Sequence, residues 1–335
     1  MVEETLVKRV STVLSQSFYM IVEEVKSIYK TKTFVVFAVL MFLPVQLILV
    51  SYATSQYPQL LFEVEKAFFL NGILEEGVID AFSDAFASAM GILIIRRGFI
   101  QASLGATTYY INIPIIAIVT LLTCGLVAAE REKGTLPVYV SKPVYRTQLV
   151  LTKFAAFALV SFALTALAYS TVYFTYALTL LGPLGMLFTG LPETISMLLV
   201  LIFFTWIFIL DIGAITSLFS SIIDRSILAG VTSLIILLLL SILPNMLVIF
   251  AGVGIASFTK YFNIPDLINQ LIDFYSLGFV EYYQNMWLII KQTGFFSQII
   301  ISRMIDPGTA LIIVILLIVI PLISACLITE KREVK

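Results

Sequence analysis

Hydrophobic residues run along this chain in long stretches that charged residues interrupt only at wide intervals. The runs 98–129 and 154–192, for example, contain no Asp, Glu, Lys or Arg. A bilayer core about 30 Å thick is crossed by about 20 apolar helical residues, so each of these runs is long enough to span a membrane. The uncharged runs together predict six transmembrane helices, at 33–53, 109–129, 154–178, 197–219, 226–251 and 308–329.

The N-terminal segment 1–32 has a different pattern, in which apolar residues recur every three or four positions. Leu6, Val10, Ile21 and Val25 follow this spacing, while Glu and Lys occupy the opposite face. The pattern predicts an amphipathic helix that lies in the membrane interface with its apolar side toward the lipid. A helix packed on a soluble partner would show the same spacing, so the pattern leaves both arrangements open.

Composition supports the membrane interpretation. Hydrophobic residues make up 60% of the 335 residues and charged residues only 12%, whereas soluble domains carry roughly 25% charged residues. We therefore expect an all-α polytopic membrane protein with one transmembrane domain, 33–329. The chain has no dense cluster of basic residues, which argues against a nucleic-acid partner.

The distribution of basic residues predicts the orientation in the membrane. Fourteen of the 20 Lys and Arg residues lie in the N-terminal arm, the hairpin 130–153, the turn 220–225 and the tail 330–335. The other six are spread over the two long loops, 54–108 and 252–307. The positive-inside rule then places both termini and the hairpin in the cytoplasm of a multi-pass plasma-membrane protein.

The two long loops are expected outside the cell. In the first, the apolar stretch 85–95 is too short to cross the bilayer, and charged residues flank it on both sides. Whether 78–97 dips into the membrane stays open. In the second, eleven aromatic residues predict helices in the outer headgroup region, in preference to a cage for a ligand.

Little in the sequence points to catalysis. There is no histidine, and the two cysteines, Cys124 and Cys326, lie inside apolar runs as expected of small core side chains. The phosphate-binding pattern G-x-x-x-x-G-K-[ST] does not occur. We therefore predict that this chain has no catalytic, metal or cofactor site and is not an enzyme, and that any ATP it responds to is bound by another polypeptide.

The hairpin 130–153 carries several turn and capping signals. Gly134 follows a charged helix end and suits a left-handed C-cap. Thr135 can cap a short surface helix that has Pro137 in its first turn. A second polar residue and Pro143 then open a helix that runs through Lys153 into the third span. The prediction is a rigid knob of helix, turn, short helix and turn at the membrane surface.

This residue order resembles the signature of ATP-binding-cassette (ABC) type-2 export permeases. In that family a Glu-x-x-x-Gly-Thr run closes the second span and a Ser-x-Pro-x-x-Arg run opens the third, often followed by a lysine. The matching residues here are Glu130, Gly134, Thr135, Ser141, Pro143 and Arg146, followed by Lys153. The six spans and the N-terminal arm fit the same family, so the resemblance extends over essentially the whole chain.

The resemblance implies a transmembrane subunit that pairs with a second, identical or similar permease and docks two ATP-binding ATPase subunits from the cytoplasm. The six matching hairpin residues would couple the ATPases to the spans, and the amphipathic arm would meet the ATPases as well. The family does not fix the substrate, and neither does this sequence.

One acidic residue, Asp211, lies near the middle of the fourth predicted span. An ionised carboxylate costs roughly 2.5–3.5 kcal/mol there, so it is expected to face protein or water. It is either a polar site on the translocation path or a partner in an interhelical hydrogen bond. It also supports a rival function, an ion-coupled secondary transporter or channel. A second rival is a non-transporting membrane anchor for an ATPase.

Overall fold

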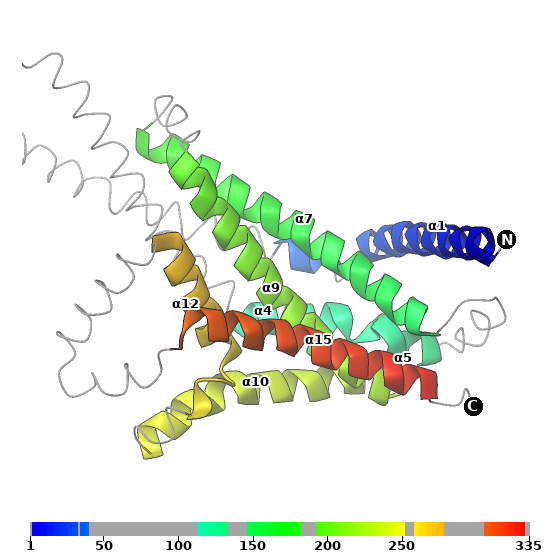
Figure 1. Cartoon of the computed structure of the whole chain (residues 1–335). Coiled ribbons are helices and arrows are strands. Elements are labelled where there is room, and N and C mark those ends of the chain that lie inside the picture. The colour runs from blue at the N-terminus through cyan, green and yellow to red at the C-terminus, as the bar shows by residue number, and fades with distance from the viewer. Residues whose placement is uncertain are drawn as a thin grey trace, which may run out of the picture.

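Figure 1 shows a computed structural model of the chain, which describes residues 2–32, 34–39, 113–132, 146–181, 192–251, 258–277 and 305–331. In these ranges the regular structure is helical, without a β-strand. The helices are α1 (Val2–Tyr29), α4 (Ile113–Thr123), α5 (Gly125–Glu132), α7 (Arg146–Leu181), α9 (Pro192–Ile222), α10 (Ser226–Ala251), α12 (Ile264–Leu277) and α15 (Pro307–Lys331). The predicted all-α fold is confirmed.

Five stretches of the described residues are helical, long and apolar enough to cross a membrane. They are Pro114–Glu132, Thr147–Thr175, Ile195–Ile222, Ser226–Pro244 and Pro307–Lys331. These stretches coincide with the second to sixth predicted spans, so the polytopic architecture is confirmed. Residues 34–39 of the first predicted span are helical. The remainder of that span, the loop 54–108 and residues 133–145 of the hairpin lie outside the described residues.

Helix α9 is the centre of the bundle. It packs against α15, α7, α12, α10, α4 and α5, and its side chains are buried on almost every face between residues 204 and 217. The contact with α7 is close, because a Cβ added to Gly213 would clash with the ring of Phe157. The Trp206 indole also donates a hydrogen bond to the Ala158 carbonyl of α7 at 2.9 Å.

Both chain termini, the end of α5 and the start of α7 lie at one end of the bundle (Figure 1). We call this the hairpin end, since α5 and α7 lead into and out of the predicted hairpin. Helix α1 lies beside α7 at this end. Val25 and Ile28 of α1 pack against the core, whereas Phe18 is 69% exposed. The predicted apolar face of the arm is therefore divided between the bundle and its surroundings.

The opposite end of the bundle contains α12, which lies in the predicted outer loop 252–307. One face of α12 is fully buried against α9 and α15, with Leu267, Ile268 and Leu271 in the core. Tyr275 stacks on Phe204 of α9, with 5.4 Å between ring centroids. This part of the predicted loop is thus a packed helix of the bundle.

Candidate coupling site

The structure describes the base of the predicted coupling hairpin. Glu130 is in the last turn of α5 and Arg146 is the first residue of α7. Gly134, Thr135, Ser141 and Pro143 are outside the described residues, so their predicted roles stay predictions.

Lys153 joins three helices at this base. Its ammonium donates a hydrogen bond to Glu130 Oε1 of α5 at 3.1 Å and pairs with Glu24 Oε1 of α1 at 2.9 Å. The Lys153 side chain is only 7% exposed, and both carboxylates are largely covered. A buried ammonium is tolerated when opposite charges compensate for its lost hydration. The two carboxylates therefore hold Lys153 in place and tie α1 to α5 and α7.

Glu24 is a residue that the sequence did not single out. It lies in the predicted amphipathic arm, 129 positions before Lys153 in the sequence. Its face of α1 also carries Ser17, whose Oγ accepts a 2.6 Å hydrogen bond from Gln148 of α7. The arm thus makes polar contacts with α7 through both Glu24 and Ser17. An open groove of about 470 Å³ lies at this junction, lined mostly by apolar atoms.

Arg131, the next residue of α5, binds the end of α9. Its guanidinium donates to the Ser221 carbonyl at 2.8 Å and lies 3.5 Å from Asp224 Oδ1. The last carbonyls of a helix have no partner within the helix, and a cation there is stabilised by the helix dipole. Asp224 is 74% exposed, so its ion pair contributes little. The carbonyl contact is the main link to α9.

Glu132, the third charged residue in succession, caps α10. Its Oε2 accepts hydrogen bonds from the backbone N–H of Ser226 at 3.2 Å and from the Ser226 hydroxyl at 2.7 Å. A carboxylate at a helix N-terminus satisfies free N–H groups and interacts favourably with the helix dipole. Glu132 therefore fixes the start of α10 to the end of α5.

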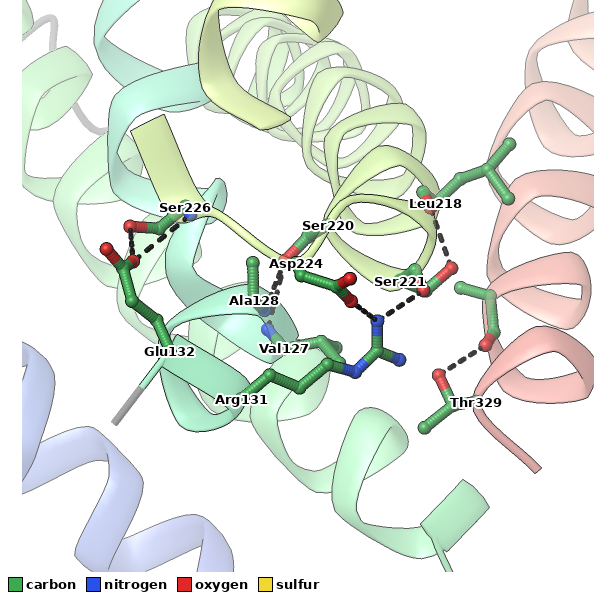
Figure 2. Close-up of polar contacts among 11 residues, drawn as sticks. Val127, Ala128, Arg131, Glu132, Leu218, Ser220, Ser221, Asp224, Ser226 and Thr329 are labelled. Atoms are coloured by element: carbon green, nitrogen blue, oxygen red, sulfur yellow. Dashed lines mark hydrogen bonds and ion pairs between the residues drawn. The ribbon is translucent and has the colours of Figure 1, made fainter. Parts of the chain in front are cut away.

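Three consecutive side chains of α5 thus reach three different parts of the bundle. Successive residues of an α-helix point about 100° apart, so three of them are directed around most of its circumference. Glu130 turns toward α7 and α1, Arg131 toward the end of α9, and Glu132 toward the start of α10. Figure 2 shows Arg131 and Glu132, whose side chains point to opposite sides of the turn between α9 and α10. We call Glu130, Arg131 and Glu132 the α5 triad.

The described contacts at this base join several helices to one another. Among the described residues, no group of three or more His, Cys, Asp or Glu side chains is placed to hold a metal ion. The contacts of the α5 triad given above are ion pairs and hydrogen bonds between helices. A displacement of the hairpin would therefore act on α1, α7, α9 and α10 together.

Asp211 lies away from this base, inside α9. It is fully buried, and neither carboxylate oxygen has a hydrogen-bond partner in the described part of the chain. The neighbours one turn away on its own helix, Phe208 and Ile215 among them, are apolar and buried. The hydrogen-bonded alternative considered for Asp211 is thus not seen among the described residues, and the group is enclosed within one copy of the chain.

Five helices long and apolar enough to cross a bilayer define a polytopic membrane protein, and ion pairs join α1, α5, α7 and the end of α9 at its hairpin end. Residues 20–334 match the model of a family described as ABC-2 family transporter protein. The match covers nearly the whole chain, so the chain belongs to this family and is a membrane permease of the ABC transporter class. No curated protein matches the chain. The family match confirms the predicted resemblance to ABC type-2 permeases for the chain as a whole.

Proposed function

We propose that this chain is the transmembrane subunit of an ABC exporter and is driven by a separate ATPase that binds at the hairpin end. The observation that carries the proposal is the ion-pair cluster of Glu24, Lys153 and Glu130. It links the two parts of the chain expected to meet an ATPase, the arm and the hairpin, to each other and to a transmembrane helix. A push on either part therefore reaches α7 directly.

The α5 triad supports the same proposal. ATP binding draws the two ATPases together beneath the permease and moves the hairpin. Through Arg131 and Glu132 this movement reaches the α9–α10 turn, and α9 is the helix that packs against most others. The movement then opens the path toward the outside of the cell. ATP itself stays on the partner ATPase.

Partners in the membrane follow from the exposed faces. Helices α10 and α15 are the least covered of the five spans, and their exposed residues are mainly Ile, Leu and Val. Lipid covers such faces, and so does a second permease in a homodimer or heterodimer. We expect the complex to contain two permease and two ATPase subunits, a stoichiometry that native mass spectrometry of the purified complex measures.

The coupling claim is tested by purifying the permease with its ATPase and measuring ATP hydrolysis in nanodiscs. Lys153→Met is expected to abolish the effect of the permease on the ATPase rate, with the two subunits still co-purifying. Lys153→Arg, which keeps the charge, should retain part of it. Lys26→Met is the matched control, because the Lys26–Glu23 pair is exposed and lies within α1 alone. Equal hydrolysis rates in Lys153→Met and wild type would contradict the coupling role.

Asp211 favours a second candidate function, an ion-coupled transporter or channel. A buried carboxyl without a partner is a functional site by default in a membrane span. This function predicts ion flux in vesicles that contain the permease alone, driven by an ion gradient, independent of ATP and lost in Asp211→Asn. Flux that requires both the ATPase and ATP would exclude it. Complex formation without any flux would instead support a membrane anchor.

A further inference from the structure

The second transmembrane helix is interrupted at Cys124. Helix α4 ends at Thr123 and α5 begins at Gly125. The part before the interruption is almost entirely apolar, whereas the part after it ends in the α5 triad. The interruption therefore separates the coupling residues from the half of the span that lies deeper in the bundle.

Ser220 of α9 fastens the second half. Its hydroxyl oxygen accepts hydrogen bonds from the backbone N–H groups of Val127 and Ala128, at 3.1 and 2.9 Å. In an uninterrupted helix these N–H groups would donate to carbonyls four residues earlier, those of Thr123 and Cys124. Ser220, which is fully buried, thus acts as an N-cap for α5 from a different helix. Figure 2 shows Ser220 between the end of α9 and the first turn of α5.

Helix α10 lies directly against the interruption. A Cβ added to Gly230 would be 3.1 Å from Cys124 Cβ and 3.3 Å from its Sγ, so a side chain there would displace Cys124. Gly125 differs, since among the described residues an added Cβ would meet only Ala129, at an ordinary 3.4 Å. Packing does not require glycine at 125. Its effect there is to keep the backbone easily deformed at the start of α5.

We propose that the interruption at Cys124 is a hinge and that Ser220 is the positioning residue of this hinge. Ser220 holds α5 to the end of α9, and Arg131 and Glu132 hold it to the α9–α10 turn. Helix α5, the end of α9 and the α9–α10 turn therefore move as one unit when the hairpin is pushed, while α4 stays with the core. The inference rests on the proposed function for its biological use, whereas the hinge itself does not require ATP.

The chain provides its own reporter of this hinge. Cys124 is partly exposed and Cys326 is buried, so Cys326→Ala leaves one thiol, at the interruption. The experiment measures the rate of Cys124 alkylation by N-ethylmaleimide in the complex of permease and ATPase, with and without ATP. The hinge is judged on the rate without ATP, and the proposed function on the change that ATP causes.

Three substitutions in this background test the assignment. Ser220→Ala removes both hydrogen bonds to the backbone of α5, so it should raise the ATP-independent alkylation rate by at least the factor of about two to ten that loss of one ordinary hydrogen bond represents. Ser220→Thr keeps the hydroxyl and should restore the slow rate. Ser217→Ala is the matched control, because Ser217 is buried one turn earlier in α9 and bonds only to the Ala214 carbonyl of its own helix. It should leave the rate unchanged.

Gly125→Ala should change the Cys124 alkylation rate in the direction opposite to Ser220→Ala. A general loss of structure would not slow alkylation. Alanine favours the helix, so this variant should stiffen the hinge and slow alkylation below the rate of the parent. Equal rates in Ser220→Ala and Ser217→Ala would overturn the assignment, whatever ATP does. If Ser220→Ala reacts faster but ATP changes no rate in the parent, the hinge stands and the ATPase coupling fails. If ATP changes the parent rate but Ser220→Ala does not, the coupling stands and the hinge fails.

Discussion

The two ends of the bundle are held together by different kinds of interaction. At the hairpin end, charged and polar side chains connect helices that are far apart in the sequence, as Lys153 does with Glu24. At the opposite end, α12 is held mainly by apolar burial and by the stacking of Tyr275 on Phe204. Hydrogen bonds weaken steeply when their angle or length changes, whereas hydrophobic burial is non-directional. The hairpin end is therefore the part whose contacts change most sharply when a helix moves.

The largest effect is expected where a charge loses its partner at the hairpin end. Lys153→Met leaves Glu24 and Glu130 facing each other without a cation between them. Breaking a buried ion pair in this way costs about 3–5 kcal/mol, because a poorly hydrated charge remains uncompensated. Thermal unfolding in detergent should show this loss. The triple variant with Glu24→Gln and Glu130→Gln should recover most of it, and no recovery would mean that Lys153 contributes through packing alone.

The next largest effect is expected at the opposite end of the bundle, where α12 packs. Leu271→Ala removes a fully buried side chain of α12, and such substitutions cost about 2–5 kcal/mol through lost burial and the cavity left behind. Its control is Ile320→Ala on α15, because Ile320 is mostly exposed. The comparison of the two ends also predicts that Leu271→Ala lowers stability without uncoupling the ATPase. If Leu271→Ala reduced permease-dependent ATP hydrolysis as much as Lys153→Met is expected to, the two ends would not differ in function.

The sequence predicted the spans well because long apolar runs leave few alternatives. The predicted span 226–251 coincides with α10 (Ser226–Ala251), and the helix expected to run through Lys153 into the third span is observed as α7. The contact of Glu24 with Lys153 could not be predicted, since helical periodicity shows which face of the arm is apolar but not which helix it meets. Ser220 carries no local signal either, because its partners are backbone groups of another helix.

The interruption at Cys124 also escaped prediction. The uncharged run gave a single uninterrupted span, 109–129, whereas α4 ends at Thr123 and α5 begins at Gly125. Gly125 was a local signal, because glycine is the weakest ordinary helix former. The α5 triad was predicted as a charged helix end with Glu130 in the coupling role. The separate contacts of Arg131 and Glu132 depend on how α9 and α10 are placed, which hydrophobicity does not determine.

A third effect, at the opposite end, depends on pH. Burial on α12 raises the pKa of Asp273 to about 6 from an ordinary value of 3.8. The folded state therefore holds this proton more tightly than the unfolded state, and stability falls as pH rises from about 4 to 6. Asp273→Asn should remove that fall and be more stable than wild type above pH 6, by no more than about 3 kcal/mol. Melting temperatures between pH 4 and 7 measure the difference.

Ser276 provides the control for this prediction. It lies one turn beyond Asp273, and within the described residues its buried hydroxyl has no hydrogen-bond partner. Ser276→Ala removes a polar group from the same helix but no titrating one, so it should keep the wild-type pH dependence. If Asp273→Asn lost as much stability as wild type when the pH rises from about 4 to 6, a group other than Asp273 would be responsible.

The smallest effect concerns a single cap at the hairpin end and separates stability from coupling most clearly. Glu132→Gln weakens the bonds to Ser226, and loss of a helix cap costs about 0.5–2 kcal/mol. A double-mutant cycle of Glu132→Gln with Ser226→Ala should give a coupling energy of that size, because the two side chains bond to each other directly. If the hairpin end transmits force, Glu132→Gln should reduce permease-dependent ATP hydrolysis far more than Leu271→Ala does, despite its smaller effect on stability. The reverse order would show that ATPase coupling follows overall stability and that the polar contacts only hold the helices together.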